Sequence, residues 1–302
     1  MSAGASRIDL LTLRLFVAAV DEQSIAKAAW RENITTSAVS KRISDLEAVL
    51  RTSLLIRHRQ GVEPTEAGRT LLSHARAILN RIDQLYNDVD DFGTGVRGLI
   101  RVSANESAAI GYLPEDIAAF LADFPLVKID MQIDTSPVVV RKVMENAVDI
   151  GVFTGIELTG ELELIPYQQD RLMLVLPNGH PLASMAGPVP FEAVLDYDLI
   201  GSETIGAIET LTLKAASKLG RTPKTRIRVS SFDAACRLVQ AGLGVTIMAE
   251  AVAMPLAQAL GILVKPIADA WTHRQLYVCF RPGRVRPGAV EHFLDLLRRR
   301  GS

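Results

Sequence analysis

Hydrophobic residues at the start of the chain repeat at the spacing of α-helices. Apolar side chains recur from Leu10 to Val20, which predicts a first helix. Two shorter helices follow, and each begins after a hydroxyl side chain that can cap it: Ser24 before IAKAAWRE and Thr35 before TSAVSKRISDLEAVL. A turn of about four residues joins them, as in a helix-turn-helix unit. The residues predicted to form its small core are Ala28, Ala29, Ile34, Val39, Ile43 and Leu46.

The next segment, LLIRHRQGVEPTEAG, is typical of a small β-hairpin. The apolar run at 54–56 predicts a strand, and Gly61 predicts a turn. Arg57, His58 and Arg59 would then stand on a wing beside the helices. Arginines on such a wing suit phosphates or a narrow minor groove.

A long amphipathic helix is predicted from its cap, Thr65, to about Val89. Apolar residues along it are spaced 4, 3, 4, 3 and 4 positions apart, which is the seam of a two-stranded coiled coil. We therefore expect this segment to form a dimer. Packing of the stripe on its own domain is the alternative. The seam residues are Leu71, Ala75, Ile78, Ile82, Leu85 and Val89.

The sequence GTGVRG at 93–98 interrupts the helical pattern. It matches the spacing of a dinucleotide-binding loop, which requires a strand before it and a helix after it. Here the order is reversed, because a helix precedes it and the strand-like LIRVSA follows. The segment is therefore interpreted as a hinge.

Beyond the hinge, strand-like and helix-like segments alternate, which predicts parallel sheets covered by helices. Two such α/β units are indicated, with strands crossing between them near 171–178 and 274–282. A cleft between two lobes is where a small ligand would bind. The expected domains are 1–64 (helices and wing, with the helix-turn-helix at 24–43), 65–92 (long helix), 93–98 (hinge) and 99–302, divided into lobe 1 at about 99–172 and 279–302 and lobe 2 at about 173–278.

Composition and charge narrow the class of protein. Hydrophobic residues make up 48% and charged residues 22%, as in an ordinary globular protein. The net charge of −1 argues against a nucleic-acid binder that relies on bulk positive charge, but the charge is unevenly divided. Residues 1–80 carry 11 Lys and Arg against 8 Asp and Glu, and the remainder carries 22 against 26.

The cysteines and the hydropathy indicate the compartment. Cys236 and Cys279 are too few for a disulfide framework, and both lie in apolar segments, so we expect buried thiols rather than a redox-sensing pair. No secretory signal and no run of 18 apolar residues is visible. We expect a cytoplasmic protein that does not enter a membrane.

Taken together, these motifs resemble those of LysR-type transcriptional regulators over nearly the whole chain. The resemblance rests on SIAKAAWRENITTSAVSKRISDLEAVL and LLIRHRQGVEPTEAG, and then on FPLVKIDMQID, AVDIGVF, LVLPNGHPLA and LVQAGLGVTIM in that order. It implies a multidomain protein: an all-α winged helix-turn-helix, a long linker helix, and a two-lobed α/β effector domain like a periplasmic binding protein.

The resemblance also implies partners. These are double-stranded DNA carrying an interrupted palindromic operator, a small-molecule effector, further copies of the chain in a dimer or homotetramer, and RNA polymerase. A small-molecule binding protein whose N-terminal helices serve only dimerisation is the alternative.

Three departures from the family pattern stand out. Thr36 occupies a position where Gln is frequent, and Thr cannot make the bidentate contact of Gln to adenine. Glu32 replaces an apolar residue, and Arg51 and Thr52 replace a turn glycine and its neighbour. We expect the last two changes to affect packing and turn geometry.

For DNA, short polar and basic side chains on the second helix of the unit suit base edges and phosphates. Ser24 and Thr65 can serve as helix caps alone or also present amides to phosphate, and Arg42 can equally lie on a solvated face. The candidates are Thr36, Ser37, Ser40 and Lys41 at the groove, and Ser24, Arg42, Arg57, Arg59 and Thr65 at phosphates or on the wing.

For the effector, polar residues at strand-to-helix junctions are the candidates, because such junctions line the clefts of α/β lobes. Each can also be a simple cap. Glu106 would repel a simple carboxylate ligand unless a cation balanced it; it can instead recognise an amine or point away. The candidates are Ser103, Asn105, Glu106, Ser107, Thr135, Ser136, Ser202, Thr204, Ser231 and Phe232.

Catalysis is not expected. The chain lacks H-E-x-x-H, G-x-S-x-G and P-loop motifs, and its five histidines are scattered without the spacing of metal ligands. We therefore expect neither a cofactor nor a bound metal ion.

Overall fold

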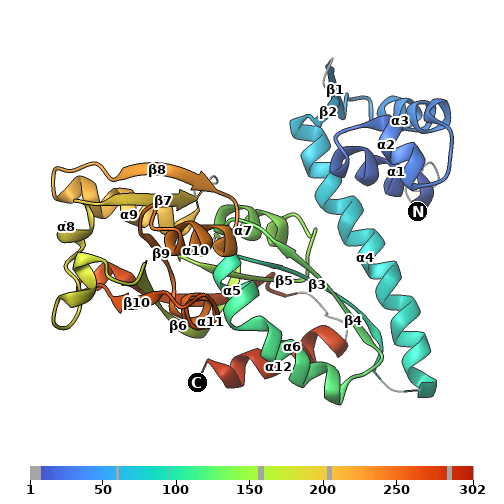
Figure 1. The fold of residues 1–302 in the computed structure, drawn as a ribbon. Helices are drawn as coiled ribbons and strands as arrows, with labels where there is room; N and C mark the ends of the chain where they lie inside the picture. The colour runs from blue at the N-terminus through green and yellow to red at the C-terminus, as the bar shows by residue number, and fades with distance from the viewer. Residues whose placement is uncertain are drawn as a thin grey trace. The chain divides into compact units, whose positions relative to one another are not determined.

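The computed structural model describes residues 8–58, 61–94, 96–155, 160–202, 206–283 and 288–301, without the side chains at 83, 84 and 86–94. The chain forms two compact units, residues up to 98 with 144–147 and residues 99–143 with 148 onward. Figure 1 shows their elements. Among the described residues, no helix is long and apolar enough to cross a membrane.

The first unit begins with three helices whose starts are fixed by side-chain caps, as the sequence predicts for two of them. Ser24 accepts a hydrogen bond from the amide of Lys27 at 3.3 Å, and Thr35 accepts one from Ala38 at 3.3 Å. Asp9 caps the first helix in the same way. The helices are Leu10–Asp21 (α1), Ile25–Arg31 (α2) and Thr36–Leu50 (α3).

A small core and a two-stranded wing complete this unit. The predicted core residues are buried, with Ile34 partly so, and pack against Leu15 and Phe16 of α1. Strands β1 (Leu55–His58) and β2 (Gly61–Pro64) pair antiparallel. Gly61 has a φ of +145°, and a Cβ there would lie 2.2 Å from the carbonyl oxygen of Gln23, so only glycine fits.

Helix α4 (Glu66–Thr94) follows the wing directly. Thr65 caps it, accepting from the amide of Gly68 at 2.9 Å while its hydroxyl donates to the carbonyl of Ser53 at 2.7 Å. Leu72 and Ala75 are buried. Strand β3 begins at Gly98, so a helix precedes the glycine-rich segment and a strand follows it.

The second unit has two α/β lobes. Among the described residues, the first lobe is built on five strands that lie next to one another in the sheet. Its strands are β3 (Gly98–Ala104), β4 (Val127–Ile133), β5 (Ile150–Thr154), β6 (Glu163–Leu176) and β11 (His273–Phe280). Its helices are α5 (Glu106–Gly111), α6 (Leu113–Asp123), α7 (Ser136–Met144) and α12 (Gly288–Arg300). Helices α6 and α12 lie side by side, with the rings of Phe120 and Phe293 4.9 Å apart.

The other lobe contains the second set of strands and helices. The strands are β7 (Asp198–Ser202), β8 (Lys224–Val229), β9 (Thr246–Ala249) and β10 (Leu263–Pro266). The helices are α8 (Phe191–Val194), α9 (Ala207–Lys218), α10 (Phe232–Gln240) and α11 (Glu250–Leu260), with single 3₁₀ turns at Pro181–Ser184 and Ala270–Thr272. Parallel strands β7 and β8 join the rest through a bond from the amide of Ile200 to the carbonyl of Val245 at 2.8 Å.

Strand β6 belongs to both lobes. Its first part pairs with β11, and residues 172–176 pair with β9 and β10. The sheet order is β10-β6-β11-β5-β3-β4, with β9 also on β6. Strand β11 pairs with first-lobe strands over its whole length, so the sequence-based lobe boundary near 279 falls inside this strand.

Both cysteines lie in packed interiors, Cys236 on the buried face of α10 and Cys279 on β11. Burial raises the pKa of the Cys236 thiol to about 11 and that of Cys279 to about 12. Protonated, buried thiols are poor nucleophiles, which favours the structural interpretation over a redox pair.

Arg51 ends α3 in the left-handed conformation, with a φ of +55°. This is the position where the family pattern has glycine. A side chain with a Cβ is strained there, and the cost is roughly 1 kcal/mol.

We predict that Arg51→Gly stabilises the first unit by about 1 kcal/mol, while Arg51→Ala, which keeps the Cβ, does not. The check is amide hydrogen exchange in α3 of the full chain, which should slow roughly five-fold in the glycine variant only. Equal protection in both variants would show that the backbone conformation is not strained.

Candidate functional site

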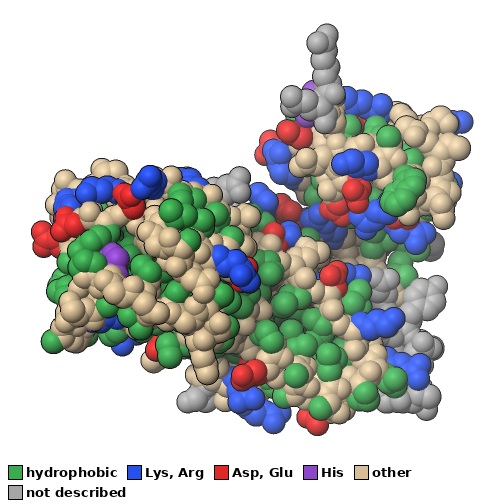
Figure 2. Space-filling model, in the orientation of Figure 1, with side chains coloured by type: hydrophobic (Ala, Val, Ile, Leu, Met, Phe, Trp, Pro, Cys, Tyr) green, Lys and Arg blue, Asp and Glu red, His purple; other side chains and the backbone are tan. Residues whose placement is uncertain are grey.

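The first turn of α3 presents an open polar face. Thr36, Ser37 and Lys41 are exposed. Ser40 is half-buried and accepts a hydrogen bond from the guanidinium of Arg57 on the wing at 3.2 Å. The structure thus brings the wing cation beside the predicted recognition helix. Figure 2 shows Lys and Arg side chains over this unit with acidic side chains among them.

Arg42 takes part in a structural contact. Its guanidinium donates to the carboxylate of Asp9 at 2.9 Å and to the hydroxyl of Thr12 at 3.0 Å. The amide of Thr12 is the main cause that holds the pKa of Asp9 below its ordinary value, and Arg42 lowers it further. Arg42 therefore ties α3 to the start of α1, and less of its charge remains for a phosphate.

Two further candidates of this unit are helix caps. Ser24 and Thr65 both hold helix starts through their hydroxyls. Arg59 lies outside the described residues. Of the departures from the family pattern, Glu32 is largely buried in an ion pair with Arg14 at 3.4 Å.

The seam of α4 is divided along its length. Leu71 packs against the core of the first unit and Ala75 is fully buried. Ile78 and Leu85 are 45% and 60% exposed, and Ile82 is half-buried. The Val89 side chain lies outside the described residues. The stripe thus packs on its own domain at its start and is exposed at Ile78 and Leu85.

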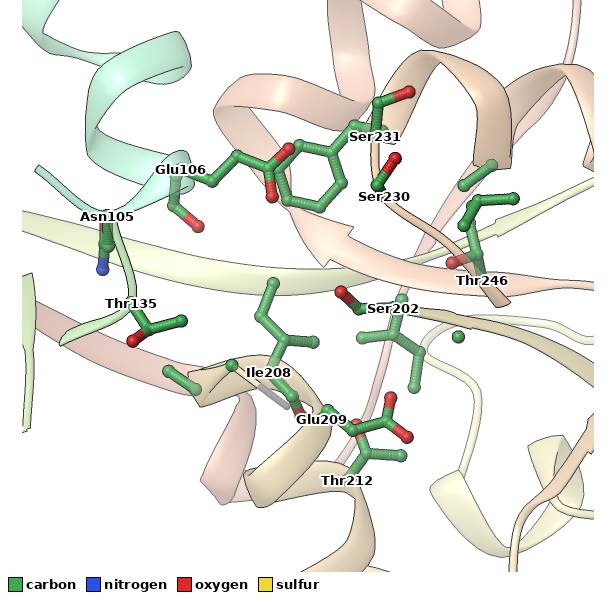
Figure 3. Close-up of a pocket in the computed structure, with 18 of the residues that line it drawn as sticks. Asn105, Glu106, Thr135, Ser202, Ile208, Glu209, Thr212, Ser230, Ser231 and Thr246 are labelled. Atoms are coloured by element: carbon green, nitrogen blue, oxygen red, sulfur yellow. Dashed lines mark hydrogen bonds between the residues drawn. The ribbon is translucent and has the colours of Figure 1, made fainter. Parts of the chain in front are cut away.

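A cavity of about 640 Å³ lies in the second unit, where helix starts from both lobes converge (Figure 3). A volume of this size suits a small organic molecule. The predicted candidates that line it are Asn105, Glu106, Ser107, Thr135, Ser136, Ser202, Ser231 and Phe232.

Two predicted residues are not part of the described wall. Ser103 is fully buried on β3 and donates to the carboxylate of Asp134 at 2.8 Å. Ser103 is not among the residues that line the cavity. Thr204 lies outside the described residues.

The structure adds wall residues that the sequence did not single out. Glu209 comes from the first turn of α9, Thr246 from the start of β9 and Arg274 from the start of β11. The helix-start position of Glu209 was a usable signal. Thr246 and Arg274 lie at the starts of strands, so a search for candidates at the starts of helices passed over them.

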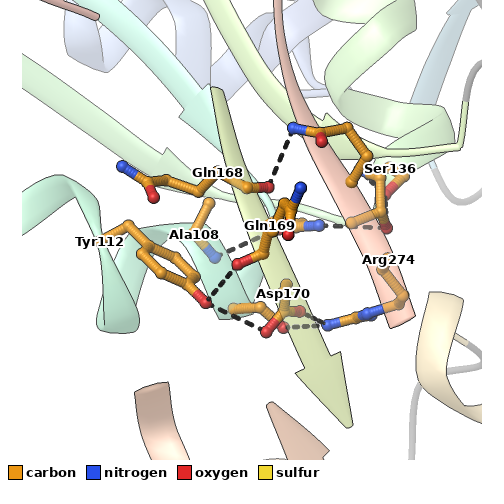
Figure 4. A network of polar contacts seen from close by, with 11 residues as sticks. Ala108, Tyr112, Ser136, Gln168, Gln169, Asp170 and Arg274 are labelled. Atoms are coloured by element: carbon orange, nitrogen blue, oxygen red, sulfur yellow. Dashed lines mark hydrogen bonds and ion pairs between the residues drawn. The ribbon is translucent and has the colours of Figure 1, made fainter. Parts of the chain in front are cut away.

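Arg274 forms a buried ion pair with Asp170 on the neighbouring strand (Figure 4). Both side chains are at most 5% exposed. Arg274 also donates to Ser107 at 3.2 Å, and the Tyr112 hydroxyl donates to Asp170 at 3.2 Å. Burial, with the Asp170 carboxylate beside it, raises the pKa of Tyr112, which therefore stays a donor. The network braces α5 against the strands that link the lobes.

Glu106, unlike Arg274, is a charged side chain of the cavity wall that has no partner among the described residues. It is the first residue of α5 and half-buried, and burial raises the pKa of its carboxyl group. Among the described residues, none forms a hydrogen bond or an ion pair with this side chain. In Figure 3 it extends into the cavity, toward the side where Ser230 and Ser231 lie.

Two family models match the chain. "Bacterial regulatory helix-turn-helix protein, lysR family" covers residues 10–69, and "LysR substrate binding domain" covers residues 93–302. The chain is 28% identical to a probable RuBisCO transcriptional regulator from Nostoc sp., in an alignment of 300 positions that covers 93% of this chain and 85% of that protein.

Solved structures share the fold. Full-length OxyR from Pseudomonas aeruginosa is similar with a TM-score of 0.72 and 19% identity, over 96% of this chain and 95% of that one. Full-length CbnR complexed with its target DNA is similar with a TM-score of 0.66 and 20% identity, over 97% of this chain and all of that one. At these identities the likeness shows the fold.

We predict that Glu106→Gln makes the ligand-free protein more stable at neutral pH. Because burial raises the folded-state pKa, the stability that Glu106 contributes is fully present below its unfolded pKa of about 4.3 and is lost as pH rises through the folded pKa. Thermal melts should show a higher Tm for the variant than for the wild type at pH 7 to 8. Near pH 4 the two Tm values should not differ.

The control is Glu115→Gln, which removes an exposed carboxylate from the first turn of α6. This change should give no gain, because acids in a first helical turn are slightly stabilising. A Glu106→Gln variant with an unchanged Tm at neutral pH would show that the carboxyl group is well solvated.

Proposed function

The chain belongs to the LysR family of transcriptional regulators, and from that premise we propose that it binds an operator through α3 and the wing and responds to a small molecule in the cavity of its second unit. It is a DNA-binding transcriptional regulator with an effector-binding domain; its family consists of regulators and not enzymes. The exposed polar start of α3 with Arg57 beside it is the observation that carries the DNA-binding assignment.

The residues proposed for base edges are those that remain open. Thr36, Ser37 and Lys41 are exposed on α3. Among the described residues, their side chains form one hydrogen bond, between the hydroxyls of Ser37 and Thr35 at 3.2 Å. Short hydroxyls and a cation can bond base edges or phosphates in the major groove. Arg57 is proposed to contact the backbone or the minor groove. This open face also argues against N-terminal helices that serve only dimerisation.

We further propose that α4 pairs two copies through its open stripe. A two-fold dimer presents two α3 helices in opposite directions, which matches an interrupted palindrome. We also propose that two such dimers form a tetramer, that this tetramer contacts RNA polymerase, and that the protein is cytoplasmic. Effector binding would act by changing how the units of this assembly are held.

The DNA-binding test uses the intergenic region beside the gene of this protein as the fragment. Ser37→Ala with Lys41→Ala should lower affinity about 100-fold, since each base or phosphate contact is worth roughly 1–3 kcal/mol. The salt dependence of log K should also become shallower by about one unit if Lys41 meets a phosphate. Lys214→Ala, an exposed lysine on α9, is the matched control.

Mobility shift and footprinting supply the measurement. The wild type and Lys214→Ala should give the same footprint, and binding should fall steeply with salt. A normal footprint with the double variant would refute the role of α3, and no salt-dependent shift with the wild type would refute operator binding at this fragment.

The dimer test changes the open stripe alone. Ile78→Lys with Leu85→Lys places like charges in the seam and should convert dimers to monomers at micromolar concentration, because an apolar seam drives two-stranded association. Sedimentation measures the mass, and Arg81→Lys on the same helix serves as control. An unchanged mass for the double variant would show that α4 is not the dimer seam.

A further inference from the structure

The charged groups of the cavity wall are balanced with one exception. Among the described residues, three of the four charged wall side chains have a counter-ion within 3.0 Å, and the fourth, Glu106, has none. The balanced pairs are Asp134 with Lys142 at 2.5 Å, Glu209 with Arg228 at 3.0 Å, and Arg274 with Asp170.

The fold gains little from Glu106. Asn105, not Glu106, caps α5 by accepting a hydrogen bond from the amide of Ala108 at 2.9 Å. The favourable effect of an acid at a helix start is small for a helix of six residues. Withdrawing a carboxylate from water without a partner opposes folding, and burial indeed raises the pKa of this group. A destabilising charge that points into a cavity is typical of a residue kept for binding.

We infer that the effector carries a protonated amine, which pairs with the Glu106 carboxylate while the apolar part of the effector lies against Ile208 and Phe232. This inference rests on the proposed function, because it takes the cavity as the effector site. It also gives the effector a charge opposite to that of a simple carboxylate, which the unpaired Glu106 would repel.

The rest of the wall suits an ammonium group and a small apolar body. An ammonium has three N–H donors, and the hydroxyl oxygens of Thr135, Ser202 and Ser231 are acceptors on different sides of the cavity (Figure 3). Phe232 offers a ring face, which attracts cations. Among the described wall residues, Glu106 is therefore the one carboxylate without a counter-ion, and several neutral acceptors lie around the cavity.

A metal ion does not satisfy the same site. Among the described residues, no group of three His, Cys, Asp or Glu side chains is placed to hold one. A single carboxylate flanked by hydroxyls and apolar side chains suits an organic cation better than a metal that needs several charged or imidazole ligands.

Matched probes that differ only in the charged group test the inference on the full-length protein. Phenethylamine is compared with hydrocinnamate, and isobutylamine with isovalerate. Each pair shares one hydrocarbon body. Binding is measured by calorimetry and by the rise in Tm that a ligand of the folded state produces. We expect the amine of at least one pair to bind roughly 10-fold more tightly than its carboxylate, or better.

Two variants assign the selectivity to this side chain. Glu106→Gln keeps the shape, removes the charge and should abolish the preference for the amine. Glu106→Asp keeps the charge at a shorter reach and should retain part of it. Glu115→Gln removes an exposed acid of the same lobe, and with it the amine preference should match that of the wild type.

The outcomes separate the inference from the proposed function. If no amine binds more tightly than its carboxylate counterpart, or if Glu106→Gln keeps the amine preference, the inference is overturned. The operator footprint is measured on the same samples without probes. If the protein prefers amines but gives no footprint, the inference about the cavity stands and operator binding is refuted. If it gives a footprint but no amine preference, operator binding stands and the inference is overturned.

Discussion

Strand β6 is the constraint on which the second unit depends. One continuous strand, Glu163–Leu176, supplies hydrogen bonds to β11 in one lobe and to β9 and β10 in the other. The lobes therefore cannot separate without breaking a backbone ladder at the point where β6 passes from one lobe to the other. The cavity forms beside that point, because helix starts from both lobes are brought there.

The Arg274–Asp170 ion pair holds β11 against β6 close to where β6 passes between the lobes. The two residues lie opposite each other on β11 and β6, and both are almost completely buried. A buried ion pair contributes little net stability because both charges lose their water, but it penalises any arrangement that separates them. Since Arg274 also contacts Ser107 at the start of α5, a ligand that shifts α5 would act on β11 and, through Asp170, on β6, which joins the lobes.

In the first unit, a few side-chain contacts define where the helices begin and how α3 is held. The core of this unit is small, so the caps at Asp9, Ser24 and Thr35 carry much of the definition of where each helix begins. The Arg42–Asp9 and Arg57–Ser40 contacts then fix α3 relative to α1 and the wing. The hydroxyls and cations on this surface thus divide into those that hold the fold and those that remain open to a partner.

The sequence by itself determined the elements whose signals are local. Helix caps, helical spacing and strand-like apolar runs depend on neighbours within a few residues, so the helix-turn-helix, the long helix and most of the α/β alternation were predictable. Helix α11 has a weaker local signal because Pro255 lies inside it, and β10 because a four-residue strand carries little pattern. Only the tertiary structure decided which polar residues share a cavity. Ser103 and Arg274 show why: the first is buried in a contact with Asp134 and does not line the cavity, whereas the second, far away in sequence, does. The lack of a counter-ion for Glu106 is likewise a property of its surroundings, which no stretch of sequence contains.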